Sequence, residues 1–83
     1  MIFEATNEFK EVSLEEGLNL LQLNKASKLY SDGLDENEYI TFNSQGFCYE
    51  DGCVIGSTVN GVLKTLLSLK WVLYHKFYVK VSS

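Results

Sequence analysis

The chain has 83 residues, of which 46% are hydrophobic and 22% charged, and its net charge is −4. A chain this short builds one hydrophobic core, so residues 1–83 are expected to form a single domain. The sequence has neither the roughly 18 consecutive apolar residues of a membrane span nor the basic start of a signal peptide, which predicts a cytoplasmic protein with no membrane partner.

Charge is distributed unevenly along the chain. Residues 1–51 carry all eleven acids and three lysines, a balance of −8, whereas residues 52–83 carry four lysines and no acid, a balance of +4. This asymmetry favours contact with an oppositely charged partner or between the unlike ends of two copies. The alternative is that the acids only solvate one face of the protein.

The first predicted element is a helix of about ten residues that begins after Ser13. Ser13 and Glu16 have the spacing of a capping box, in which each side chain accepts a hydrogen bond from the backbone N–H of the other residue. Leu14, Leu18 and Leu21 recur at helical spacing and define the buried face. Asn24 tolerates a left-handed backbone and is expected to end the helix.

Short strands joined by turns are predicted next. We expect strands at 25–31, 39–42, 47–49 and 53–55, with an acidic loop at 31–38. The sequence Asn-Ser-Gln-Gly at 43–46 is typical of a four-residue turn, and Asp51-Gly52 is typical of a two-residue hairpin loop. The last three strands therefore form a β-meander.

The two turns decide which meander residues share a face of the sheet. One face is expected to hold Ile40, Phe42, Phe47, Tyr49 and Val54 under the helices, and the other Tyr39, Thr41, Cys48, Glu50, Cys53 and Ile55. Both cysteines then lie on the helix-free face as diagonal neighbours, at a separation beyond the usual disulfide span. Free thiols are therefore favoured over a disulfide or a metal site, and no cofactor is expected.

A second helix and a closing strand complete the prediction. Apolar residues at helical spacing predict a helix over 58–69. Residues 70–81 alternate over twelve positions, which predicts a long strand with His75 on its core face. His75 is expected to be a structural histidine held by a hydrogen bond, since no general acid or nucleophile is evident beside it.

Together these elements predict an α+β domain. Two helices should pack on one face of a mainly antiparallel sheet of four or five strands, with the β-meander in the middle and a long C-terminal strand. The acidic loop lacks the spacing of a calcium-binding loop, and no set of acid, base and nucleophile can be assembled. The protein is therefore not expected to be an enzyme.

Two candidate binding surfaces follow from the predicted faces. The residues expected to bind a partner protein are acidic and aromatic: Asp32, Asp35, Glu36, Glu38, Tyr39, Glu50 and Asp51. The residues expected to bind another copy, or an anionic ligand, are lysines and tyrosines: Lys28, Tyr30, Tyr74, Lys76, Tyr78 and Lys80. An alternating Lys/Tyr strand can also stack bases and neutralise phosphates, as single-strand binders do.

The segment "EVSLEEGLNLLQLNKASKLYSDG", the turn-rich meander and "VLKTLLSLKWVLY" together resemble a class of short phage-encoded proteins. The resemblance covers residues 11–74 and rests on short motifs at Ser13, Leu14, Glu15, Glu16, Leu21, Lys25, Leu66, Lys70 and Trp71. Characterised proteins of similar layout are the Thoeris anti-defence family, which sequesters a cyclic nucleotide signal, and an anti-CRISPR group. The resemblance implies an oligomeric, non-catalytic counter-defence protein.

The leading functional prediction is a phage-type inhibitor in the cytoplasm of the bacterial host. It would bind a host protein through the acidic and aromatic surface, where carboxylates imitate nucleic-acid phosphates. One alternative is sequestration of an anionic nucleotide at a subunit interface, and another is single-stranded nucleic-acid binding by the C-terminal Lys/Tyr strand. A homo-oligomer is expected, because so small a domain buries little of its own surface.

Overall fold

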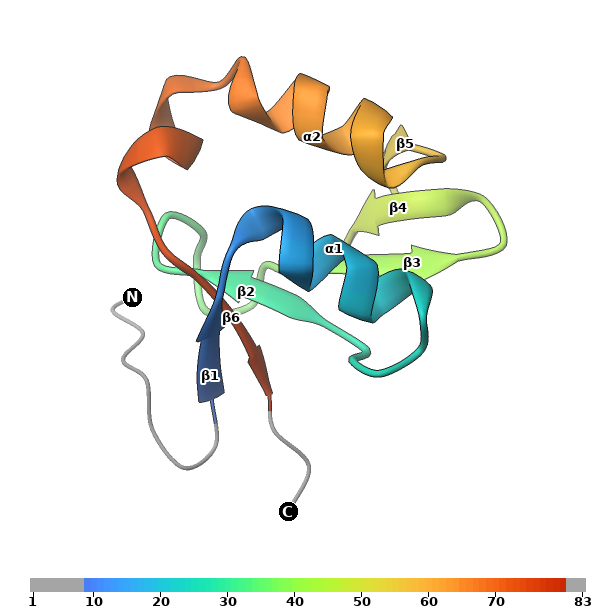
Figure 1. Ribbon diagram of the computed structural model, residues 1–83, viewed down its shortest axis with the longest axis horizontal. Helices are drawn as coiled ribbons and strands as arrows, with labels where there is room; N and C mark the ends of the chain where they lie inside the picture. Colours follow the sequence, from blue (N-terminus) through green and yellow to red (C-terminus); the bar gives the residue numbers. More distant parts are fainter. Residues whose placement is uncertain (1–8, 81–83) are drawn as a thin grey trace.

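The computed structural model describes residues 9–80, which form one antiparallel sheet with two α-helices on one of its faces (Figure 1). The strands are β1 (Phe9–Val12), β2 (Leu29–Ser31), β3 (Ile40–Asn43), β4 (Gly46–Tyr49), β5 (Val54–Gly56) and β6 (Phe77–Lys80), and the helices are α1 (Leu14–Gln22), α2 (Val59–Leu67) and the 3₁₀ helix η1 (Lys70–Tyr74). The predicted α+β class is confirmed, with six strands in place of four or five.

Strand order in the sheet is β1-β6-β2-β3-β4-β5. β6 lies between β1 and β2 and is antiparallel to both, so the two ends of the described chain run side by side. α1 links β1 to β2 across β6, which makes a split β-α-β unit. The strand β1 was not predicted, because its four residues include Lys10 and Glu11 and its only partner lies at the other end of the chain.

α1 begins and ends where the sequence predicts. The Ser13 hydroxyl accepts a hydrogen bond from the Glu16 backbone N–H at 3.0 Å, and Asn24 has a positive φ of 59° just after the helix. Gly17 lies where α1 approaches the sheet, since a Cβ atom there would stand 2.5 Å from Leu29 Cδ1. A larger residue at position 17 would therefore push the helix away from β2.

The core lies between the helices and the sheet. Its buried residues come from both layers: Val12, Leu14, Leu18, Leu21, Leu29, Ile40, Phe47, Val62, Leu66, Val72, Phe77 and Val79. Burial of each such aliphatic or aromatic side chain stabilises the fold by about 1.5–3 kcal/mol before the cost of ordering the chain is subtracted. Both helices are held on the sheet by this shared cluster.

The β3–β4 pairing has the predicted register. Ile40 is opposite Tyr49, Thr41 opposite Cys48 and Phe42 opposite Phe47. The three apolar residues nearest the helices, Ile40, Phe42 and Phe47, are buried in or packed against the core as expected. The four-residue turn at 43–46 therefore sets the alignment of this hairpin.

The register predicted for the next hairpin is wrong by one residue. The Tyr49 N–H donates to the Cys53 carbonyl at 3.0 Å, and the Gly52 N–H donates to the Tyr49 carbonyl at 2.9 Å, so the loop has three residues and not two. Gly52 closes it with a positive φ of 90°, as in the common turn followed by a bulge. Cys48 is consequently opposite Val54, which is 53% exposed, while Ile55 packs against the core.

The two cysteines are free thiols, as predicted. Cys48 shares a face with Thr41, on the side of the sheet opposite the core, but it is 1% exposed and not open to solvent. Cys53 is exposed and lies opposite Tyr49 instead of Glu50. Cys53 is therefore accessible to solvent, whereas Cys48 is not.

The long closing strand predicted over 70–81 is wrong in its first half. Residues Lys70–Tyr74 form η1, and only Phe77–Lys80 are a strand within the described chain. The neighbours of β6, which are β1 and β2, have four and three residues, so a longer strand would leave its backbone N–H and C=O groups without partners. Val72, placed outside by alternation, is instead buried in the core.

Candidate functional site

Three carboxylates from two separate turns lie near Tyr49, because Ile40, two residues after Glu38, is opposite Tyr49 in the β3–β4 pairing. Glu38 ends the loop between β2 and β3, whereas Glu50 and Asp51 belong to the turn between β4 and β5. The pKa of Tyr49 is raised, first by burial and then by the negative charges of these three residues. The acidic loop and the hairpin turn therefore form one negatively charged region, which we call the acidic surface: Asp35, Glu36, Glu38, Tyr39, Tyr49, Glu50 and Asp51.

The loop between β2 and β3 presents its acids on an ordered turn. Glu38 Oε1 accepts a hydrogen bond from the Asp35 N–H at 2.9 Å, and the Glu38 N–H donates to the Asp35 carbonyl at 2.9 Å. Asp35 and Glu36 are exposed at the tip. Because these contacts fix the backbone, the two carboxylates are held in place before any partner arrives.

Asp51 organises the second turn. Asp51 Oδ1 accepts a hydrogen bond from the Cys53 N–H at 2.9 Å. Hydrogen bonds from the backbone and side chain of Cys53 lower the pKa of Asp51, and the same contact raises the pKa of the Cys53 thiol. This contact therefore disfavours the thiolate of Cys53, which is the nucleophilic and metal-binding form of the side chain.

Glu50 carries an unsatisfied acceptor. Its Oε1 atom is shielded from solvent and has no hydrogen-bond partner among the described residues. A shielded carboxylate oxygen without a donor is unfavourable, and native proteins rarely keep such a group without a reason.

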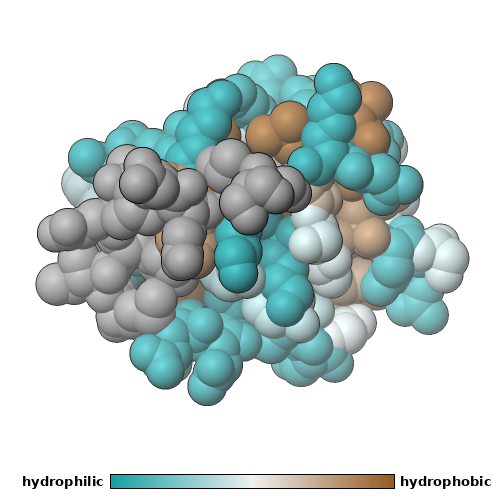
Figure 2. All heavy atoms as spheres, turned by 90° about the horizontal axis from the view of Figure 1, so that it is seen from below, coloured by the Kyte–Doolittle hydropathy of each residue, from teal (hydrophilic) through white to brown (hydrophobic). Residues whose placement is uncertain are grey.

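Aromatic residues flank the acidic surface on the helix-free face. Lys28 Nζ lies 4.6 Å from the centre of the Tyr39 ring, and the Tyr30 ring is 6.1 Å from Tyr39. Phe9 meets Tyr30 edge-on at 5.4 Å. Seen from below, the described surface is largely hydrophilic, with hydrophobic residues emerging in places (Figure 2).

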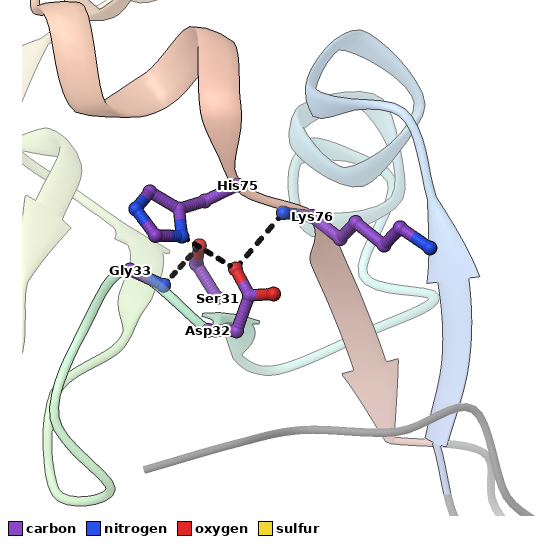
Figure 3. A network of polar contacts seen from close by, with 5 residues as sticks. All are labelled: Ser31, Asp32, Gly33, His75 and Lys76. Carbon is purple, nitrogen blue, oxygen red and sulfur yellow. Dashed lines mark hydrogen bonds and ion pairs between the residues drawn. The ribbon is translucent and has the colours of Figure 1, made fainter.

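Asp32 is not part of the acidic surface, contrary to prediction. Its Oδ1 atom lies 3.0 Å from His75 Nδ1 and accepts a hydrogen bond from the Lys76 N–H at 3.0 Å (Figure 3). The Ser31 hydroxyl beside it accepts a hydrogen bond from the Gly33 N–H at 3.1 Å. This network ties the start of the loop after β2 to the segment between η1 and β6.

His75 is hydrogen-bonded as predicted, but it is exposed and does not lie on the core face. A carboxylate at Nδ1 orients a histidine as in hydrolases, where Nε2 then serves a nucleophile. Within residues 9–80 no hydroxyl or thiol is hydrogen-bonded to this ring. The contact therefore acts as a structural link in the described part of the chain.

The predicted Lys/Tyr surface is divided by the fold. Tyr30 and Tyr78 are paired across β2 and β6, but Tyr78 is 3% exposed. Tyr74 lies in η1, away from any strand, and is 82% exposed. Lys80 is exposed, and the Lys76 side chain runs toward β1, where its Nζ atom is 3.8 Å from Glu11 Oε1 (Figure 3). No continuous stripe links Tyr74 to Lys80.

No group of three or more His, Cys, Asp or Glu side chains within 9–80 could hold a metal ion. No helix in this part of the chain is long and apolar enough to cross a membrane.

Comparison with known proteins gave no match: no family model, no curated protein and no solved structure is significantly similar to this chain. The resemblance to phage counter-defence proteins stays a prediction.

Two features of the site were missed from the sequence. Tyr49 packs against the core as predicted, but its place beside Glu38, Glu50 and Asp51 was not recognised, although its position next to Glu50 and Asp51 was a usable signal. The contact between Asp32 and His75 joins residues 43 positions apart, and nothing local in the sequence indicates it.

Proposed function

We propose that this protein is a non-catalytic binding protein whose acidic surface attaches to a basic region of another protein. The observation that carries the proposal is the β3–β4 pairing, which places Ile40 opposite Tyr49 and so brings Glu38 near Glu50 and Asp51 from two turns that are separate in sequence. Following the predicted phage-type role, the partner would be a host protein with a nucleic-acid-binding groove, and the carboxylates would occupy its phosphate sites.

The geometry suits rapid, charge-steered association. Oppositely charged surfaces accelerate encounter and set orientation more than they add raw affinity. The acids lie on turns closed by their own hydrogen bonds, so little further ordering is needed on binding. Half-buried Tyr39 supplies aromatic contact area beside the charges on the helix-free face.

The test is affinity capture from a bacterial lysate followed by elution with salt. The native protein should retain a basic protein and release it as ionic strength rises. Changing Glu50→Gln together with Asp51→Asn removes two charges, while the Asn carbonyl can still accept from the Cys53 N–H. We expect this variant to lose most of the captured partner.

A matched control removes two charges elsewhere. Glu15 and Glu16 are exposed on the first turn of α1, and Glu15→Gln with Glu16→Gln changes the net charge by the same amount. Capture should survive in this variant. Equal losses in both variants would show that only overall charge matters, and unchanged capture in the Glu50/Asp51 variant would contradict the proposed site.

A second candidate is binding of an anionic nucleotide beside Lys28. The lysine stands over Tyr39, with Tyr30 adjacent, which combines a cation with aromatic rings on which a base can stack. A thermal shift panel of cyclic nucleotides tests it, since a ligand at a hundredfold excess over its Kd stabilises by about 2.7 kcal/mol. Lys28→Glu should remove any shift.

A further inference from the structure

Exposed apolar side chains are concentrated at η1. Six large hydrophobic residues of the described chain are exposed, and four of them fall between positions 67 and 74. We call these four the η1 patch: Leu67 (47% exposed), Leu69 (38%), Leu73 (63%) and Tyr74 (82%). Single exposed hydrophobic residues are ordinary, but four within eight positions indicate a contact surface.

A hollow of about 230 Å³ opens beside the patch. It lies between the end of α2, the segment that follows η1, and the start of α1, and it is lined by Glu11, Val12, Ser13, Leu14, Leu67, Val72, His75, Lys76 and Phe77. Val12, Leu14, Val72 and Phe77 are buried core residues and give it an apolar floor. Projecting apolar side chains and a recess able to receive one therefore occur on the same surface.

Charges of opposite sign border the patch. Residues three apart in a 3₁₀ helix lie on the same side, which puts Lys70 with Leu73 and Trp71 with Tyr74. Trp71 packs against the loop after β2, since a Cβ atom on Gly33 would lie 2.6 Å from Trp71 Cε3. The exposed acids Asp35 and Glu36 belong to that loop. Exposed Lys70 thus borders the Leu73 side, and the loop that carries the two acids packs against Trp71 on the Tyr74 side.

We propose that the η1 patch binds a second copy of this chain about a two-fold axis. In this arrangement, Leu73 or Tyr74 of each copy enters the hollow of the other, and Lys70 of each faces Asp35 and Glu36 of the other. A two-fold interface must be complementary to itself. The η1 patch and its surroundings meet this requirement, because they contain projecting apolar side chains, a hollow and charges of both signs. The predicted oligomer surface along β6 is replaced by one centred on η1.

The first test is the molar mass in solution over a concentration series, measured by light scattering. The native protein should be a dimer, and Leu73→Asp should be a monomer over the same range. Leu23→Asp is the matched control, because Leu23 is also 63% exposed but lies at the end of α1. Circular dichroism checks that both variants are folded. A monomeric native protein, or a Leu73→Asp variant as dimeric as the control, would overturn the proposal.

A charge exchange tests the two-fold arrangement. Lys70→Glu and Glu36→Lys each place like charges opposite one another, and each should weaken dimerisation about tenfold. The double variant restores opposite charges and should recover the native dimer constant. Failure of the double variant to recover would contradict this orientation. Asp35 and Glu36 belong to both the acidic surface and this interface, but Glu50 and Asp51 belong only to the acidic surface. Capture by the Glu50/Asp51 variant therefore tests the acidic surface separately from the dimer.

Discussion

Two regions of the molecule find partners for their backbone N–H and C=O groups in different ways. One is the meander of β3, β4 and β5, and the other is the segment from Leu69 to Phe77. The meander pairs with its immediate neighbours in sequence. The strands beside β6 have four and three residues, so the segment before β6 coils into η1, and Asp32 fastens it by a contact with His75, 43 positions later. The acidic surface therefore rests on local structure, whereas the η1 patch rests on distant contacts.

The largest effect is expected in the meander, from Gly46→Ala. Gly46 has a φ of +113°, and a Cβ atom there would lie 2.5 Å from the Gly56 carbonyl oxygen in the neighbouring strand. Backbone strain and the clash should together lower the free energy of unfolding by about 2–5 kcal/mol, measured by urea denaturation.

The control for that change is Gly52→Ala. Gly52 also has a positive φ, of +90°, but a Cβ atom there would meet nothing within 4 Å. Only the cost of a positive φ at an alanine applies, so the free energy of unfolding should fall by about 1–2 kcal/mol. Equal losses at the two glycines would show that the strand contact does not matter.

At the η1 end, the strongest effect is expected from Gly33→Ala. A Cβ atom would lie 2.6 Å from Trp71 Cε3 and 2.9 Å from His75 Cδ2, so both rings must move. Overpacking of this kind should cost about 1–3 kcal/mol of stability. In a Trp71→Leu background the cost should shrink, and a double-mutant cycle measures the difference. If the stability losses of the two substitutions are fully additive, the Trp71 ring does not press on the loop that contains Gly33.

A smaller effect is expected from Asp32→Ala. The carboxylate accepts a hydrogen bond from the Lys76 N–H and contacts His75, and it is partly exposed, so its loss should cost about 1–2 kcal/mol. Asp32→Asn retains an acceptor and should recover part of the loss. If dimerisation depends on the position of η1, Asp32→Ala should also weaken the dimer, whereas Gly52→Ala should not.

The difference between local and distant contacts also explains which features could be predicted from the sequence. The cap at Ser13 and the turn at 43–46 are decided by residues within a few positions of each other, and both were predicted correctly. The Asp51-Gly52 turn fits loops of two or three residues, because either places glycine at a positive φ. The choice changes the partners of Tyr49 and Cys48, until a bulge restores the alignment of a two-residue loop at Phe47 and Gly56.

The errors at β1 and η1 have a different cause. Alternation at 70–81 indicated a strand, but the length of β6 is limited by β1 and β2, which are far away in sequence. The meeting of the acidic loop with the Glu50–Asp51 turn, in contrast, follows from the correctly predicted register of the β3–β4 hairpin. The pairing of β6 with β1 and β2 joins residues far apart in sequence, and residue spacing alone carries no information on it.

The smallest predicted effect concerns pH at the Asp51 turn. Hydrogen bonds from Cys53 lower the pKa of Asp51 in the folded protein, so they stabilise the fold above the unfolded pKa, and this contribution disappears as pH falls through the lower folded value. Asp51→Ala should therefore lower Tm at neutral pH, and the difference from the native protein should narrow below about pH 3.9, the unperturbed value for Asp. Asp35→Ala, at an exposed acid on the other turn, is the control. A difference at Asp51 that stays constant across this range would mean that the turn is held by its backbone and not by the ionised carboxylate.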